Sequence, residues 1–133
     1  MNREKILVVD DSKPMLKLLE VVLKERYTVY PASSAFNAIN WLQKGNTPDL
    51  IITDIEIPYI DGIDFIHHVS NSIYYNNIPI LILSGYSKEE IKLKKRNLKI
   101  QGYIMKPFDP TELQKRIDGI LAKSNATGSA NLN

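Results

Sequence analysis

The stretch Ile6-Leu7-Val8-Val9-Asp10-Asp11 places four consecutive apolar residues directly before two acids near the start of the chain. A strand with one face in water alternates apolar and polar residues, whereas a strand that is covered on both faces is apolar throughout. The segment Lys5–Val9 is therefore predicted to be an inner strand of a parallel sheet, with two carboxylates at its carboxyl end.

Similar short apolar runs recur along the chain and alternate with stretches of helical period. Four further strands are predicted over Tyr27–Pro31, Leu50–Thr53, Ile78–Leu83 and Ile100–Met105. This alternation predicts an α/β fold in the order (βα)5, with one domain over residues 1–123. Residues 124–133 have neither periodicity nor charge, so they are predicted to be a disordered tail or the start of a linker.

Capping residues mark where the helices of this pattern begin. Ser12 followed by Pro14 predicts a helix start, and the apolar stripe expected to face the sheet is Met15, Leu18, Leu19, Val22 and Leu23. Further helices are predicted after Ser34, Asp61-Gly62, Ser87 and Asp109. The last of them is expected to bury Leu113, Ile117, Ile120 and Leu121.

Composition excludes several classes of protein. The 133 residues include no cysteine, so thiol nucleophiles and zinc–thiolate sites are excluded. The 17 basic and 15 acidic residues give a net charge of +2, which is too small for bulk attraction to nucleic acid. The apolar run at residues 6–9 is too short for a signal peptide or a membrane span. We therefore expect a cytoplasmic domain that binds neither nucleic acid nor membrane.

Polar residues follow four of the five predicted strands. Asp10 and Asp11 follow the first, Asp54 the third, Ser84 the fourth and Lys106 the fifth. Ligands of open parallel sheets bind at the carboxyl ends of the strands, so these side chains are expected at one edge. Clustered carboxylates repel unless a cation neutralises them, and Mg²⁺ prefers oxygen ligands. Together with a lysine and a hydroxyl, the pattern predicts phosphoryl transfer to a carboxylate nucleophile.

Four motifs in this order resemble those of response-regulator receiver domains of two-component signalling, over residues 4 to 123. They are Ile6–Asp11, Asp54–Pro58 with Asp61-Gly62, Leu83-Ser84-Gly85, and Tyr103–Phe108. The resemblance implies a doubly wound, flavodoxin-like, five-stranded parallel sheet with the strand order 2-1-3-4-5.

The resemblance also implies a role for each acid. Asp54 matches the phosphoacceptor, and Asp11 with Asp54 matches the carboxylates that bind Mg²⁺. Asp10 is expected to hold a metal-bound water, and the backbone carbonyl of Glu56 matches a further metal ligand. The phosphoryl donor would be a histidine kinase or a phosphotransfer protein. The domain is expected to phosphorylate itself from such a donor and to lose the group slowly, without being a turnover enzyme.

Three other positions match the part of the family that transmits the signal. Lys106 would pair with the phosphoryl oxygens, and its peptide bond to Pro107 is expected to be cis. Ser84 and Tyr103 match the switch pair, which would remodel the face of the fourth helix, fifth strand and fifth helix. A downstream protein target is expected to bind that face. Tyr86 is expected at the mouth of the site, where its ring could exclude water.

Several alternatives stay open at this point. A pseudo-receiver would bind partners without being phosphorylated. A phosphatase of the haloacid-dehalogenase type would need an acid where Ser12 stands. The chain is either a separate regulator or a receiver from a larger protein. A basic cluster near the fourth helix is either a solvated face or an acidic docking site; it comprises Lys92, Lys94, Lys95, Arg96 and Lys99.

Overall fold

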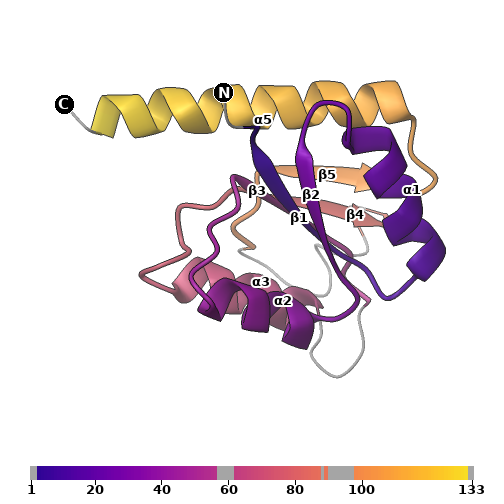
Figure 1. Ribbon diagram of the computed structural model, residues 1–133, viewed down its shortest axis with the longest axis horizontal. Helices are drawn as coiled ribbons and strands as arrows, with labels where there is room; N and C mark the ends of the chain where they lie inside the picture. The colour runs from indigo at the N-terminus through magenta and orange to yellow at the C-terminus, as the bar shows by residue number, and fades with distance from the viewer. Residues whose placement is uncertain (1–2, 57–61, 88, 90–97, 132–133) are drawn as a thin grey trace.

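The computed structural model describes residues 3–56, 62–87, 89 and 98–131 and contains a parallel sheet with helices on both faces (Figure 1). Its strands are β1 (Lys5–Val9), β2 (Thr28–Ala32), β3 (Leu50–Thr53), β4 (Ile80–Ser84) and β5 (Gly102–Met105). They lie in the order β2-β1-β3-β4-β5, which confirms the expected topology. Strands β1 and β3 match the predicted bounds. β2 begins one residue later than predicted, and β4 and β5 begin two residues later.

The helices are α1 (Lys13–Leu23), α2 (Ala35–Gln43), α3 (Gly62–Asn71) and α5 (Pro110–Asn131). In Figure 1, α1 and α5 cover one face of the sheet, and α2 and α3 cover the other. The predicted fourth helix falls largely on residues 88 and 90–97, which lie outside the described residues. No helix within the described ranges is long and apolar enough to cross a membrane.

The apolar run of β1 supplies both layers of the core. Leu7 and Val9 belong to the buried cluster that contains the inward side chains of α2 and α3. Ile6 and Val8 belong to the cluster that contains those of α1 and α5. Each of the four is at most 2% exposed. Because successive side chains of a strand point to opposite faces, a strand with helices on both faces must be apolar at every position.

The predicted caps are present at three helix starts. The hydroxyl oxygen of Ser12 accepts a hydrogen bond from Met15 N at 3.2 Å, and that of Ser34 accepts one from Asn37 N at 3.1 Å. The carboxylate of Asp109 accepts one from Thr111 N at 2.9 Å. These oxygens satisfy backbone N–H groups that have no partner within the helix.

The buried face of α1 differs from the predicted stripe. Leu16, Leu19 and Leu23 are buried, whereas Leu18 is 45% exposed. Leu18 lies about 100° around the helix from Leu19, so both cannot face the sheet at the centre of the contact. The prediction for Leu18 was therefore wrong. The predicted stripe of the last helix is confirmed, since its four residues are all buried.

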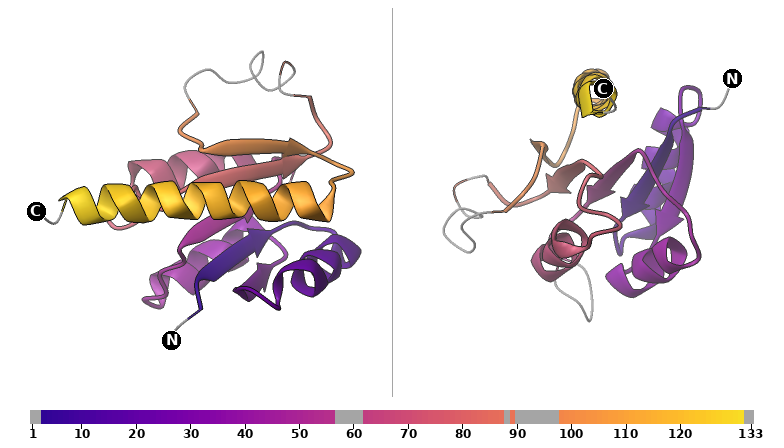
Figure 2. Two further views of the ribbon diagram at one scale, coloured as in Figure 1. Left: turned by 90° about the horizontal axis from the view of Figure 1, so that it is seen from above. Right: turned by 90° about the vertical axis from the view of Figure 1, so that its left-hand side faces the viewer.

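The last helix is longer than the sequence predicts. Residues 124–131, expected to be a tail or a linker, continue α5 as far as Asn131, and Figure 2 shows this part projecting past the sheet. Extending an existing helix adds one hydrogen bond for each residue that is fixed, and this segment contains no proline to end it. The domain boundary at residue 123 stays a prediction.

Tyr27, the residue before β2, contacts α5. Its ring is buried, and its hydroxyl donates a hydrogen bond to the carboxylate of Asp118. The guanidinium of Arg26 lies 2.6 Å from the other oxygen of the same carboxylate. Burial of the ring and then the bond to Asp118 raise the pKa of Tyr27 above its ordinary value. The phenol therefore stays protonated and acts as a donor.

Gly62 lets α3 begin against the residues that follow β3. Its N–H donates to the carbonyl of Ile55 at 2.8 Å. A Cβ at this position would lie 2.4 Å from the carbonyl oxygen of Asp54 and 2.6 Å from Cα of Ile55. Real Cβ atoms do not approach backbone atoms so closely, so any side chain here would push α3 away from the end of β3.

Gly62→Ala is expected to lower the free energy of unfolding by about 2 kcal/mol or more, because backbone atoms have to move to admit the methyl group. Urea denaturation measures the change. Gly119→Ala is the matched control: its Cβ would meet nothing within 4 Å, so this change inside α5 is expected to stabilise by up to about 1 kcal/mol. Equal effects of the two variants would contradict the close approach at Gly62.

Tyr27→Phe is expected to lower the free energy of unfolding by about 1 to 2 kcal/mol, because Asp118 loses one of its two donors. Tyr74→Phe is the control, since Tyr74 is 80% exposed and its change should stay within about 0.5 kcal/mol. Thermal or urea unfolding measures the change in the free energy of unfolding for both variants. A Tyr27 variant as stable as the control would show that the bond to Asp118 contributes nothing.

Candidate functional site

The register of the sheet brings the predicted site residues to one edge. Val9 pairs with Thr53, so the next residues, Asp10 and Asp54, lie side by side at the strand ends. The N–H of Asp54 donates to Val9 O at 3.0 Å, and that of Lys106 donates to Ser84 O at 2.8 Å. These bonds extend the ladders by one step and hold the backbone of the functional residues.

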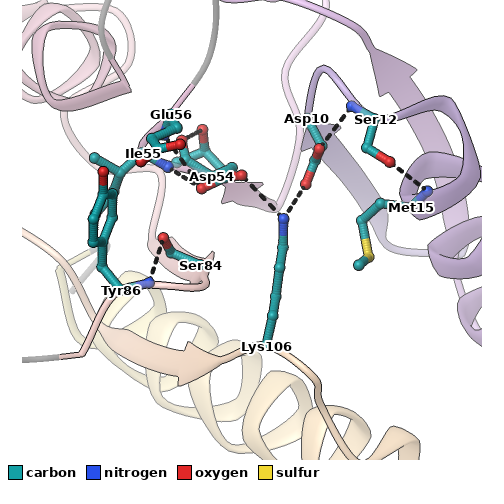
Figure 3. Close-up of polar contacts among 10 residues, drawn as sticks. Asp10, Ser12, Met15, Asp54, Ile55, Glu56, Ser84, Tyr86 and Lys106 are labelled. Atoms are coloured by element: carbon teal, nitrogen blue, oxygen red, sulfur yellow. Dashed lines mark hydrogen bonds and ion pairs between the residues drawn. The ribbon is translucent and has the colours of Figure 1, made fainter.

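The ammonium group of Lys106 lies between two carboxylates (Figure 3). Its Nζ is 2.7 Å from Oδ2 of Asp10 and 3.0 Å from Oδ2 of Asp54. The side chains of Lys106, Asp10 and Asp54 are only 20%, 3% and 11% exposed. Burial lowers the pKa of Lys106, but the hydrogen bonds and charges of both carboxylates outweigh it and raise the pKa above its ordinary value. Lys106 is therefore a cation throughout the physiological range.

Both carboxylates are also held by backbone N–H groups. Oδ1 of Asp54 accepts hydrogen bonds from Ile55 N at 2.6 Å and from Glu56 N at 3.3 Å. Oδ1 of Asp10 accepts one from Ser12 N at 2.9 Å, next to the cap of α1. Each carboxylate thus has one oxygen directed to the backbone and one to Lys106, which fixes its orientation before any ligand binds.

A third carboxylate completes an oxygen cluster. Asp10, Asp11 and Asp54 each offer an oxygen atom, and these atoms lie within 4.8 Å of one another. Asp10 and Asp54 are buried, whereas Asp11 is exposed. Hard oxygen donors at this separation suit Mg²⁺, which takes one or two carboxylates and keeps several waters. These three residues could therefore hold a divalent cation.

The two predicted switch residues meet through the backbone of Tyr86. The hydroxyl oxygen of Ser84, which is buried, accepts a hydrogen bond from Tyr86 N at 3.3 Å. The hydroxyl of Tyr103 donates to the carbonyl oxygen of Tyr86. Sequence reasoning considered only the ring of Tyr86, which is half-buried and packs against the core under α2 and α3. The position of Tyr86 two residues after Ser84 could have predicted the hydrogen bond from its backbone N–H to the Ser84 hydroxyl.

The remaining predicted positions lie around this centre. The side chain of Glu56 is exposed, and the metal-binding role of its carbonyl stays a prediction. The Lys106–Pro107 peptide bond is cis, in agreement with the expectation from the resemblance. Gly62, noted in the sequence only as a helix start, sets the position of α3 against Asp54. Residues 57–61 of the second motif lie outside the described residues, as do Lys92, Lys94, Lys95 and Arg96 of the basic cluster.

Comparison with known proteins agrees with this geometry. The family model described as "Response regulator receiver domain" matches residues 6–118. The phosphate regulon transcriptional regulatory protein PhoB of Escherichia coli is 32% identical over 120 residues, which are 90% of this chain and 52% of that protein. Sensor histidine kinase TmoS of Ectopseudomonas mendocina is 30% identical over 91% of this chain and 12% of that protein. The chain thus spans about half the length of PhoB and much less of the kinase.

Solved structures show the same fold. A putative response regulator from Chloroflexus aurantiacus J-10-fl superimposes with a TM-score of 0.84 at 33% identity, covering 91% of this chain and 99% of that one. Chemotaxis response regulator CheY4 of Vibrio cholerae gives a TM-score of 0.81 at 29% identity, covering 90% and 99%. With the family match over most of the chain, this protein belongs to the response regulator receiver domain family.

Proposed function

We propose that this receiver domain accepts a phosphoryl group on Asp54 and passes the signal to another protein by direct contact. One observation carries the proposal: the ammonium of Lys106 lies within 3.0 Å of Asp54 beside two further carboxylates, at the carboxyl ends of the strands. A nucleophile, a compact cation and an oxygen cluster in one place are what phosphoryl transfer to a carboxylate needs.

Asp54 is the nucleophile in this proposal. A carboxylate oxygen of Asp54 forms the new bond to phosphorus, and the P–N bond of a phosphohistidine donor breaks. The electron pair of that bond leaves on the imidazole nitrogen of the donor, which then takes up a proton. The backbone N–H groups of Ile55 and Glu56 hold the Asp54 carboxylate by its Oδ1 atom, so the nucleophile is oriented before the donor arrives.

The carboxylates of Asp11 and Asp54 would bind Mg²⁺ directly, with Asp10 acting through a water and Glu56 through its carbonyl. When bound, Mg²⁺ neutralises the charge of carboxylate and phosphoryl oxygens that approach one another. Lys106 would exchange its bond to Asp54 for a bond to a phosphoryl oxygen while keeping Asp10 within reach. Its charge therefore stabilises the site both before and after transfer.

The switch is proposed to run through Ser84, Tyr86 and Tyr103. A phosphoryl oxygen on Asp54 would attract the Ser84 hydroxyl, which now accepts a hydrogen bond from Tyr86 N. Movement of the segment around Tyr86 would alter the carbonyl that Tyr103 contacts. Phosphorylation would thus favour a second arrangement of the fourth helix, β5 and α5, and a downstream target would bind that arrangement.

The proposed donor is a histidine kinase or a phosphotransfer protein in the cytoplasm. Relatives with matching segments include a sensor histidine kinase and hybrid signal transduction histidine kinase D of Dictyostelium discoideum, which support this class of donor. We propose no contact with nucleic acid or membrane for the domain. In this proposal it acts as a phosphoacceptor and does not turn over a separate substrate.

Acetyl phosphate with Mg²⁺ is expected to add one phosphoryl group to the wild-type protein and none to Asp54→Asn, as measured by intact mass spectrometry. Asp64→Asn is the control, because Asp64 is exposed on α3 and is not part of the carboxylate cluster. A phosphorylated Asp54→Asn variant would mean that another residue is the acceptor. A wild-type protein that stays unmodified would favour the pseudo-receiver alternative.

Lys106→Met is expected to lower the free energy of unfolding without metal by about 2 kcal/mol, because the carboxylates of Asp10 and Asp54 lose their shared cation. Added Mg²⁺ binds only the folded cluster and therefore stabilises it. The effect should be larger in this variant than in the wild type, because the variant has no ammonium group to balance the carboxylates. Lys44→Met, at an exposed site, is the control for loss of a charge. Thermal unfolding with and without Mg²⁺ tests this, and an Mg²⁺ effect equal in all three proteins would count against the cluster.

A further inference from the structure

A basic groove lies at the end of the sheet opposite the proposed phosphorylation site. It has a volume of about 900 Å³ and is bounded by residues 76–79, by residues 99–101 and by the stretch of α5 from Lys115 to Ser124. The first two segments lead into β4 and β5, so the groove is at the amino ends of these strands. Strand length separates it from Asp54 by about 15 Å, and both places can be occupied together.

Four cationic side chains line this groove. Lys115, Arg116 and Lys123 come from α5, and Lys99 comes from the segment before β5. Nζ of Lys99 donates to Asn76 O at 2.9 Å, which holds it at the wall. Within the described ranges, no carboxylate lies within 4.0 Å of Lys99, Lys115 or Arg116. The like charges repel one another, and an anion in the groove would relieve that repulsion.

The floor of the groove is apolar. Pro79 and Ile120 are buried, and Ile100 is half-buried against the core. The described lining residues include no acid and no aromatic ring. A nucleotide or a single-stranded nucleic acid would find phosphate partners here but no ring on which a base could stack. An aliphatic side chain flanked by carboxylates fits both the floor and the rim.

Gly119 provides a second and independent observation. It lies inside α5 on the groove, where a glycine is about 1 kcal/mol less favourable than alanine. A Cβ at this position would meet nothing within 4 Å, so packing within the described structure does not require glycine. The missing side chain leaves the groove open between Arg116 and Lys123, which allows the backbone of a ligand to approach the helix.

We propose that the basic groove binds an acidic segment of a partner protein, one that carries carboxylates next to an aliphatic side chain. The carboxylates of the segment would pair with the cations at the rim of the groove, and its aliphatic side chain would be buried on Ile100 and Ile120. Both contacts contribute to the binding free energy. This contact does not depend on phosphorylation of Asp54. It gives the domain a second binding site for a partner at the amino ends of β4 and β5, and this site shares α5 with the face proposed to respond to the phosphoryl group.

The test uses a short fluorescein-labelled peptide of Glu-Leu repeats and fluorescence anisotropy with the full chain. We expect saturable binding that weakens as salt is added and is lost when glutamine replaces glutamate in the peptide. Lys115→Glu/Arg116→Glu should raise the Kd by at least about tenfold. Lys24→Glu/Lys44→Glu changes the net charge equally at exposed sites outside the groove, and should raise the Kd by less than about threefold.

The variant Gly119→Gln distinguishes a blocked groove from a general loss of stability. The longer side chain should fill the groove and raise the Kd by about tenfold, whereas the melting temperature should stay equal or rise because glutamine favours a helix. Asp54→Asn should bind the peptide like the wild type, so failure of the proposed phosphorylation would leave this result unchanged. The proposal would be overturned if both charge-reversal pairs weakened binding equally, or if Gly119→Gln left the Kd unchanged. It would also be overturned if ATP displaced the labelled peptide at a lower concentration than the unlabelled peptide does.

Discussion

The contact of the Lys106 ammonium with Asp10 and Asp54 is the interaction on which the site depends. Two buried carboxylates with a third beside them would repel one another at the edge of an apolar sheet. The lysine compensates that charge while leaving Asp11 exposed and able to meet a cation from solvent. The same compensation makes the site responsive, because a phosphoryl group or a divalent cation changes which charges the lysine has to balance.

The parallel sheet makes that contact possible. Asp10, Asp54 and Lys106 are separated by more than forty residues at each step, yet each follows a strand whose carboxyl end lies at the same edge. The cores on the two faces hold those strands in register, because β1 contributes two side chains to each core. Gly62 adds a local requirement, since α3 begins in contact with the backbone of Asp54 and Ile55. Packing far from the site therefore decides the distances within it.

Two ends of one sheet offer two kinds of chemistry. The carboxyl ends of the strands carry acids and Lys106, and they suit a cation and a phosphoryl group. The groove near the amino ends of β4 and β5 carries lysines and an arginine over an aliphatic floor, and it suits an acidic segment. α5 connects the two regions: it starts a few residues after Lys106 and lines the groove farther along.

Local pattern in the sequence was sufficient for β1 and β3, three helix caps and the polar residues at the strand ends, because these follow from periodicity and backbone hydrogen bonding between near neighbours. The strand order came from the family resemblance and was confirmed. Tertiary structure alone decided that Leu16 rather than Leu18 faces the sheet, that Gly62 touches the end of β3, and that Tyr86 links Ser84 to Tyr103 through its backbone. It also decided the basic groove, whose walls come from segments far apart in the chain. Such features depend on how helices and strands pack against one another, and that packing involves residues far apart in the chain, so no short stretch of sequence predicts it.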